Sequence, residues 1–307
     1  MRMKLFDLHC DTLTECYRKG ERILCASGDW DIARGIRYSP WCQVFAVWLP
    51  DTIRGEQAWE FCQEVLQFAH TQANVLANRF RFVRTAQELE KTVAEGVCAG
   101  VLGIEGGAVL AGKPERVKWL AEQGVRVMTI TWNGDNELGH GCLSNDLSGL
   151  TPVGKQVINE MERYGIVPDV SHLNEAGFWD VAATAKRPFI ASHSVSKAVH
   201  SHPRNLTDEQ FCAIRDHKGL VGLTLDNAQL GEQTFDCVYR HVSHYWALGG
   251  EDTVAFGFDL DGTPLPASWW GGTVAEQLTE YLLSRGIPQA TVEKLIFDNA
   301  YRFFTGI

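Results

Sequence analysis

The chain has 307 residues, and its 45% hydrophobic and 21% charged residues are the proportions of an ordinary globular protein. The formal net charge of −10 argues against a nucleic-acid or anionic-membrane partner, because binding phosphate groups needs a basic surface. No run of about 18 apolar residues occurs, so we expect no segment that crosses a membrane.

The cysteines and the start of the sequence point to a reducing compartment. Nine cysteines cannot all pair with one another, and none of them forms a C-x-x-C motif. The first residues lack the apolar stretch and the small-residue cleavage site of a secretory signal. We therefore expect reduced thiols and a cytoplasmic protein.

Short apolar or β-branched runs recur along the chain and predict eight strands. In chain order we expect them at Leu5–Leu8, Gln43–Trp48, Val97–Ile104, Val125–Thr131, Gly165–Val170, Pro188–Ala191, Gly219–Thr224 and Thr253–Gly257. Longer segments with helical periodicity separate the strands. We expect helices at Glu56–Asn78, Glu115–Gln123, Thr151–Arg163, Asn174–Thr184, Thr207–Asp216, Phe235–Leu248, Thr273–Ser284 and Gln289–Phe304.

The alternation of strands and helices predicts an α/β fold with a parallel sheet and right-handed crossovers. Eight such units favour a (β/α)8 TIM barrel. An open doubly wound sheet is the alternative, but no G-x-G-x-x-G motif follows an early strand. We expect one domain over residues 1–307, with an elaborated loop near residues 19–40 that contains a short helix.

Side chains that can bind metal follow five of the predicted strands. His9 and Asp11 lie two residues apart, so in an extended backbone they point to the same side. The later strand ends supply Glu105, His172, His193 and Asp259. A single histidine after a strand is more often a hydrogen-bonded structural residue, but this set shares one end of the predicted barrel, where barrel enzymes place their chemistry. It is too large for one tetrahedral zinc site and suits two divalent ions about 3.5–4 Å apart.

The order of these motifs resembles the renal (membrane) dipeptidase family, peptidase family M19, whose members are binuclear zinc peptidases built on amidohydrolase-type barrels. The resemblance extends over nearly the whole chain. The blocks that carry it are Asp7-Leu8-His9-Cys10-Asp11-Thr12-Leu13, Gly103-Ile104-Glu105-Gly106-Gly107, Asp169-Val170-Ser171-His172, Ser192-His193-Ser194, Arg204-Asn205, Phe258-Asp259-Leu260-Asp261-Gly262 and Asp298-Asn299-Ala300-Tyr301-Arg302-Phe303-Phe304.

The resemblance implies two Zn²⁺ ions per chain and a role for each ligand. His9 and Asp11 correspond to the ligands of one zinc, and His172 and His193 to those of the other, with Glu105 between the two ions. Zinc lowers the pKa of a bound water toward about 7, which supplies hydroxide at neutral pH.

The same resemblance places two further residues in contact with the substrate. Asp259 corresponds to the aspartate that transfers a proton or holds the substrate's amino group. Arg204 corresponds to the arginine that binds the substrate's terminal carboxylate, a task suited to its planar guanidinium.

One position departs from the family pattern. Mammalian members carry a histidine after the fourth strand that contacts the substrate carbonyl, and here Trp132 stands in its place. Asn133, Asn136 and His140 are candidate replacement donors, and we place Trp132 and Asn133 among the expected substrate contacts.

We therefore expect a zinc-dependent dipeptidase whose substrates include dipeptides with C-terminal D-residues. The alternatives are an enzyme that cleaves another amide, a lactam or an ester, and a barrel that binds metal without catalysis. A small dipeptide is the expected partner, and the resemblance alone suggests a homodimer.

Overall fold

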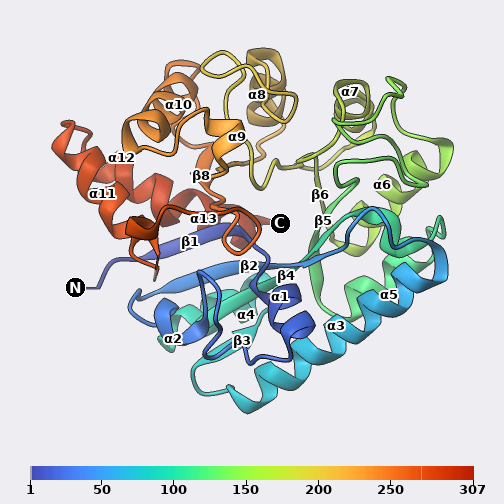
Figure 1. Cartoon of the computed structure of the whole chain (residues 1–307), viewed down its shortest axis with the longest axis horizontal. Helices are drawn as coiled ribbons and strands as arrows, with labels where there is room; N and C mark the ends of the chain where they lie inside the picture. Colours follow the sequence, from blue (N-terminus) through green and yellow to red (C-terminus); the bar gives the residue numbers. More distant parts are fainter. Residues whose placement is uncertain (1, 271) are drawn as a thin grey trace.

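A curled parallel β-sheet occupies the middle of the molecule, and helices pack around it (Figure 1). The structure is a computed structural model that describes residues 2–270 and 272–307. Its strands are β1 (Leu5–Cys10), β2 (Trp41–Trp48), β3 (Phe80–Phe82), β4 (Cys98–Glu105), β5 (Val125–Thr129), β6 (Val167–Asp169), β7 (Val221–Leu223) and β8 (Val254–Phe256). Their order in the sheet is β6-β5-β4-β2-β1-β8-β7, with β3 beside β4.

Parallel pairing brings the carboxyl ends of strands distant in sequence to one edge of the sheet. Trp48 at the end of β2 pairs with Glu105 at the end of β4, and Glu105 also pairs with Thr129 of β5. The strands are buried along nearly their whole length, as expected for a parallel sheet covered by helices. The fold is therefore the predicted α/β class.

The predicted strand at Pro188–Ala191 is much reduced. Ile190 forms a parallel bridge to Asp169 of β6, and Ala191 forms one to Val221 of β7. These two isolated bridges are the only ladder contacts of that segment among the described residues. The segment therefore lies between β6 and β7 without being assigned as a regular strand.

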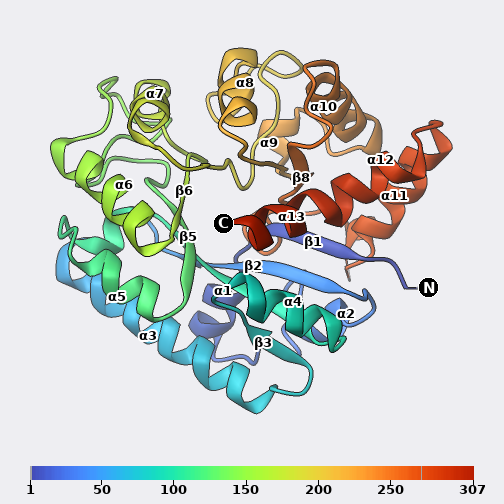
Figure 2. The same ribbon diagram turned by 180° about the vertical axis from the view of Figure 1, so that it is seen from behind.

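The helices follow the predicted alternation and lie outside the sheet, as the view from behind also shows (Figure 2). They are α1 (Thr12–Lys19), α2 (Ile32–Gly35), α3 (Gly55–Val75), α4 (Ala86–Ala94), α5 (Arg116–Glu122), α6 (Pro152–Tyr164), α7 (Glu175–Thr184), α8 (Asp208–Asp216), α9 (Asn227–Leu230), α10 (Phe235–Ala247), α11 (Val274–Ser284), α12 (Gln289–Glu293) and α13 (Asn299–Gly306). Short 3₁₀ segments occur at Gly107–Leu110 and Ala267–Trp269.

Local signals account for several helix starts. The side chains of Thr151, Asn174 and Thr207 each accept a hydrogen bond from a backbone N–H in the first turn of α6, α7 and α8. The predicted closing helix is interrupted by a π-helical segment at Lys294–Asp298, which separates α12 from α13. The short helix expected near residues 19–40 is α2.

Two expectations from the sequence concern the cysteines and the absence of a membrane-spanning segment, and the structure agrees with both. All nine cysteines are unpaired, and most of them are buried. Across residues 2–270 and 272–307, no helix combines the length and the apolar character that a membrane span requires.

A buried histidine anchors the loop that carries Arg204. Nδ1 of His241 on α10 accepts a hydrogen bond from the backbone N–H of Ser196 at 3.2 Å, and its Nε2 donates to the carbonyl of Leu230 at 3.2 Å. Ser196 in turn forms a parallel bridge with Leu206. This arrangement needs a neutral imidazole, because an imidazolium has no acceptor nitrogen. Burial accordingly lowers the pKa of His241 to about 4.

We predict that His241 makes the protein acid-sensitive. The unfolded chain binds a proton at this histidine near pH 6.5, whereas the folded chain binds it only near pH 4, so acidification through this window favours unfolding. The stabilising contribution is fully present above pH 6.5. Urea titrations from pH 8 to pH 4 should show the free energy of unfolding falling more steeply for the wild type than for His241→Gln. Parallel curves for the two proteins would contradict the prediction.

Candidate metal centre

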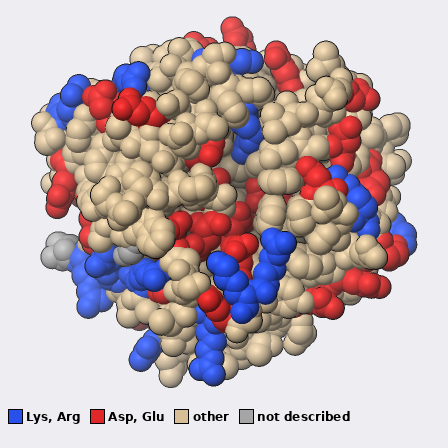
Figure 3. Space-filling view, viewed as in Figure 1, with Lys and Arg blue, Asp and Glu red and all other residues tan. Residues whose placement is uncertain are grey.

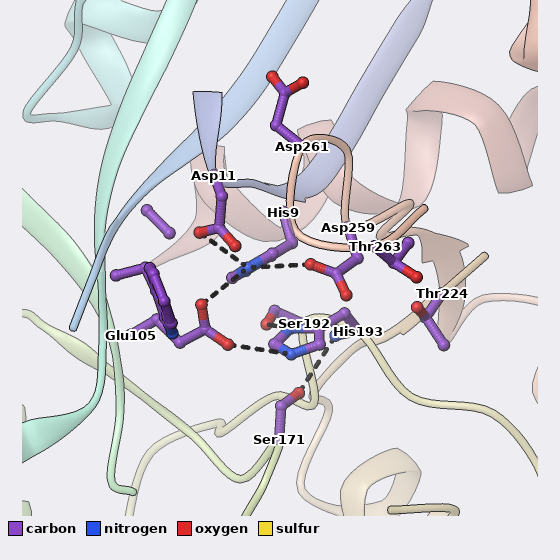
Figure 4. Close-up of polar contacts among 12 residues, drawn as sticks. His9, Asp11, Glu105, Ser171, Ser192, His193, Thr224, Asp259, Asp261 and Thr263 are labelled. Atoms are coloured by element: carbon purple, nitrogen blue, oxygen red, sulfur yellow. Dashed lines mark hydrogen bonds and ion pairs between the residues drawn. The ribbon is translucent and has the colours of Figure 1, made fainter. Parts of the chain in front are cut away.

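Six side chains expected from the sequence meet at the carboxyl ends of the strands, and Figure 4 labels all of them except His172. His9 lies among three carboxylates: its Nε2 is 3.4 Å from Oε2 of Glu105, 3.7 Å from Oδ1 of Asp11 and 3.7 Å from Oδ1 of Asp259. His9, Asp11 and Glu105 are buried, and the side chain of Asp259 is 14% exposed. The cluster is therefore largely shielded from solvent but open on the side of Asp259.

The two oxygens of the Glu105 carboxylate face different histidines. Its Oε2 points to His9, whereas its Oε1 lies 2.7 Å from Nε2 of His172 and 3.5 Å from Nε2 of His193. The end of β4 fixes this position, because Glu105 is the last residue of a fully buried strand paired on both sides. One carboxylate thus joins the two halves of the cluster.

The outer nitrogens of two histidines have defined hydrogen-bond partners. The hydroxyl of Ser192 donates to the acceptor-only carboxylate of Asp169, so its oxygen is left to accept from Nδ1–H of His193 at 2.8 Å. Nδ1–H of His172 donates in the same way to Oδ1 of Asn133 at 2.8 Å. Both imidazoles are thereby held with a lone pair on Nε2, the nitrogen that faces the cluster.

These lone pairs create a need for a cation. The Nε2 atoms of His172 and His193 lie 2.8 Å apart, and each also faces Oε1 of Glu105. Burial lowers the pKa of His172 to about 4 and that of His193 well below its usual range, so neither is protonated at neutral pH. Acceptor atoms this close repel one another unless a positive ion lies among them.

The carboxylates of the cluster reinforce this need for a cation. Burial raises the pKa of Asp11 well above its usual value and that of Asp259 to about 7, with the charge of Glu105 adding to both shifts. Burial alone would lower the pKa of His9, but Glu105, Asp11 and Asp259 together raise it to about 10. The same field that favours a proton on His9 favours a divalent cation.

The donor set fits a transition-metal ion. His9 Nε2, Asp11 Oδ1 and Glu105 Oε2 are buried without a hydrogen-bond partner. Two triads within the cluster bring their donor atoms close enough for one ion: His9, Glu105 and His193, and His9, Asp11 and Asp259. Imidazole nitrogens with carboxylate oxygens are the ligands of catalytic zinc.

Backbone strain marks the same strand ends. His172, Asp259 and Asp261 have φ angles of 70°, 65° and 67°, a left-handed conformation that costs about 1–3 kcal/mol at a residue other than glycine. His172 follows β6, and the two aspartates follow β8. The fold therefore holds these side chains in directions that an unstrained strand end would not give.

Gly262 and Asp261 complete the turn after β8. A Cβ atom on Gly262 would lie 2.5 Å from Oδ2 of Asp11, so only glycine lets this turn approach the cluster. The carboxylate of Asp261 accepts hydrogen bonds from the hydroxyl of Thr12 and the backbone N–H of Asp29, and it points away from His9 (Figure 4). Asp261 thus ties the turn to α1 and to the loop before α2.

A cavity of about 440 Å³ opens onto the cluster. Acidic atoms gather in the hollow in the middle of this face, with basic side chains along one edge (Figure 3). The cavity is lined by the cluster carboxylates and by Arg204, Trp132 and Asn133, the three remaining residues expected to contact substrate. A second hollow of about 520 Å³ lies at the opposite, amino-terminal ends of the strands, near Leu220 and Thr253, away from the cluster.

Arg204 is positioned to bind an anion. Its side chain lines the cavity although the residue is only 8% exposed. Within the described chain no carboxylate forms an ion pair with its guanidinium. Asn205 fixes the neighbouring backbone, because its Nδ2 donates to the carbonyls of His200 and Gln229 at 2.8 Å.

The candidate donors near Trp132 separate into two groups. Asn133 lines the cavity and supports His172. Asn136 is occupied within its own loop, where its side chain bonds to Ile130, Leu138 and Gly139. His140 lies against Asp135 and Ser148, and neither Asn136 nor His140 lines the cavity.

Several residues of the site were not among those predicted. Asp169 and Ser192 support His193, and their signal in the sequence is a polar residue inside or directly after a buried apolar run. Trp48, Arg18 and Glu15 line the cavity, and their signal is their place at the end of β2 and on the helix that follows Asp11.

Comparison with known proteins gives consistent matches over the whole chain. The family model described as membrane dipeptidase (peptidase family M19) matches residues 1–307. A protein of Klebsiella pneumoniae, named as an uncharacterized protein in the pqqA 5′ region, is 34% identical over 244 residues, which cover 75% of this chain and 90% of that protein. Dipeptidase verJ of Clonostachys rogersoniana is 28% identical over 247 residues, covering 79% of this chain and 64% of that protein.

Two solved structures match nearly end to end. A metallo peptidase from Rhodobacter sphaeroides, liganded with a phosphinate mimic of the dipeptide L-Ala-D-Ala, has a TM-score of 0.91 and 27% identity, and 99% of each chain is covered. A structure described as dipeptidase AC, a metallo peptidase of family M19, has a TM-score of 0.91 and 26% identity over 100% of both chains.

We predict that Ser192→Ala weakens metal binding by about 10- to 100-fold, because His193 then loses the partner that fixes its tautomer. Competition titration of zinc against a chromophoric chelator measures this directly, without any enzymatic assay. Ser192→Thr retains a hydroxyl and should restore most of the affinity.

Ser194→Ala is the matched control, since this neighbouring buried hydroxyl has no hydrogen-bond partner. Unchanged zinc affinity in Ser192→Ala would show that the hydrogen bond to His193 does not support the metal.

Proposed function

This chain belongs to the membrane dipeptidase family, peptidase family M19, and on that premise we propose that its cluster binds two zinc ions and cleaves dipeptides. The chain is a metal-dependent dipeptidase. In our proposal His9 and Asp11 would hold one ion, His172 and His193 would hold the other, and Glu105 would serve both. The observation that carries the proposal is the carboxylate of Glu105, whose two oxygens face different histidines.

The two compact triads of the cluster share His9, which leaves a second grouping of ligands to consider. One grouping would place His193 beside His9 and Glu105 instead of with His172. We favour the pairing of His172 with His193 because their Nε2 atoms lie 2.8 Å apart and both are oriented by partners behind them.

Bound divalent metal would supply the Lewis acidity that activates water and polarises the scissile carbonyl. The protein's own groups would handle the proton and the substrate. The side chain of Asp259 lies at the open side of the cluster and is 14% exposed, so its carboxylate can exchange a proton with a water there. Oδ1 of Asp259 is the atom that faces the cluster, and we propose that it accepts the proton of the attacking water and passes it to the leaving amine.

Arg204 would bind the carboxylate of the substrate. Its guanidinium is largely enclosed and lines the cavity, and no carboxylate of residues 2–270 and 272–307 pairs with it, so an incoming carboxylate would find it available. The related metallo peptidase from Rhodobacter sphaeroides binds a phosphinate mimic of L-Ala-D-Ala. That ligand supports the proposal that the substrates of this chain include dipeptides with a C-terminal D-residue.

We also propose that the sheet closes as a single (β/α)8 barrel domain. The parallel bridges of Ile190 to β6 and of Ala191 to β7 support closure, because they place this segment between the two outer strands of the sheet. The family model spans residues 1–307, which supports one domain. Nine unpaired cysteines support a reducing compartment such as the cytoplasm, and the homodimer stays a prediction.

The first test is metal dependence across a substrate panel. We expect zinc-loaded protein to hydrolyse dipeptides, including those ending in D-Ala, and to be inactive on lactones and β-lactams. Removing the metal should abolish hydrolysis, and Glu105→Gln should bind fewer than two zinc ions with the fold kept, as measured by elemental analysis and circular dichroism. Full turnover by thoroughly stripped protein would exclude the proposed chemistry, and cleavage of lactones alone would reassign the substrate.

The second test concerns Arg204. Arg204→Lys keeps the positive charge but loses the planar pair of donors, so kcat/KM for a dipeptide should fall by about 10- to 100-fold, mainly through KM. A dipeptide amide has no terminal carboxylate, and its already slow hydrolysis should change much less. If both substrates lose activity equally, Arg204 does not bind the carboxylate.

A further inference from the structure

Two tryptophans form one side of the cavity, next to the metal ligands. Trp48 is the last residue of β2 and pairs in register with Glu105 on β4, so the two side chains point to the same side of the sheet. Trp132 follows β5, the strand on the other side of β4. The two indoles therefore flank the strand end that carries Glu105, and both line the cavity.

The indoles contact each other and are held in place from behind. Their ring centroids lie 5.3 Å apart with the planes at 72°, an edge-to-face arrangement, and Trp132 lies 6.2 Å from the ring of His172. The guanidinium of Arg18 lies 5.2 Å above the ring of Trp48, and Thr14 accepts the backbone N–H of Trp48 at 2.9 Å. Helix α1 thus fixes both the backbone and the ring of Trp48.

Three charged groups of the cavity come from parts of the chain away from β4. Arg204 precedes α8, Asp226 follows β7, and Asp259 follows β8, and the sheet order separates β7 and β8 from β4 by β1 and β2. A dipeptide places its ammonium and carboxylate against charged groups, and its side chain must then contact the rest of the cavity wall. The cavity wall beside Glu105 consists mainly of the two indoles, with Asn133 next to Trp132 and with Arg18 and Glu15 next to Trp48.

Arg18 is a poor partner for an acidic side chain despite its charge. Its guanidinium is engaged with Trp48, and Oε1 of Glu15, which also lines the cavity, lies 3.8 Å from it. The Arg18 charge is therefore partly balanced already.

We infer that Trp48 and Trp132 form a subsite for a bulky apolar, above all aromatic, side chain of the dipeptide. This inference rests on the proposed dipeptidase function and names its substrate class. Aromatic side chains gain from edge or offset contacts with an indole in addition to the apolar surface that they bury. A methyl side chain at the same position reaches little of this surface.

The test compares matched dipeptides in wild type and Trp48→Ala. We expect the wild type to favour Phe over Ala, at one of the two substrate positions, by about tenfold or more in kcat/KM. Trp48→Ala should lower kcat/KM for the Phe dipeptide about tenfold more than for Ala-Ala, and Trp48→Phe should recover most of the difference. Trp179→Ala is the matched control, because this half-exposed tryptophan on α7 does not line the cavity.

A binding measurement separates this inference from the dipeptidase function. Calorimetry with phosphinate dipeptide mimics carrying Phe or methyl side chains reports the subsite even if no dipeptide is cleaved. About tenfold tighter binding of the Phe mimic, lost in Trp48→Ala and kept in Trp179→Ala, supports the subsite. Equal affinities, or a preference for a Glu side chain that disappears in Arg18→Ala, would overturn it. Absence of dipeptide cleavage alone would overturn only the proposed function.

Discussion

The mutual repulsion of buried acceptor atoms around Glu105 is the constraint on which this structure depends. Nitrogens of three histidines and oxygens of three carboxylates converge in a largely enclosed space. Each strand end contributes little alone, and the parallel sheet brings them together by placing all carboxyl ends at one edge. His172 and His193 cannot relieve the repulsion by changing tautomer, because Asn133 and Ser192 fix their outer nitrogens. A bound cation would supply the compensating charge in place of the proton that the same carboxylates favour on His9.

This constraint also accounts for the features around the centre that would destabilise an ordinary strand end. Asp259 and His172 adopt left-handed backbone conformations, and Asp169 lies in the interior, satisfied by Ser171 and Ser192. The packing of the surrounding sheet compensates for the free energy that these residues cost. A site of this kind is expected in a rigid frame, where backbone direction and side-chain partners are both determined.

Much of the fold and of the ligand set could be predicted from the sequence, because the spacing of apolar residues identifies strands and helices and the positions of polar residues identify strand ends and helix caps. The strands at Leu5–Leu8 and Gln43–Trp48 are apolar runs of recognisable length, and the helix at Asn174 begins with a capping side chain. The family resemblance read from the motif blocks is confirmed by the match over residues 1–307.

The elements that were missed or altered depend on tertiary contacts. β3 has three residues and exists through its pairing with β4, and the segment at Pro188–Ala191 forms only isolated bridges. Within the site, ligand types could be inferred from spacing, whereas the partners behind them could not. Asp169 supports His193 through Ser192, which lies 23 residues further along the chain and comes close to Asp169 only in the folded sheet.

Helix α1 has a consequence for how this protein can vary. Asp11 directly precedes the helix, Thr14 holds the end of β2, and Arg18 covers Trp48, so one rigid element of two turns connects metal ligation with the wall of the cavity. A substitution that moved α1 and so changed substrate selectivity would also move the metal ligand Asp11. Trp132 lies on the loop after β5, where its neighbour Asn133 orients the ligand His172, so a new substrate preference at either tryptophan can arise only if the metal ligands stay in place.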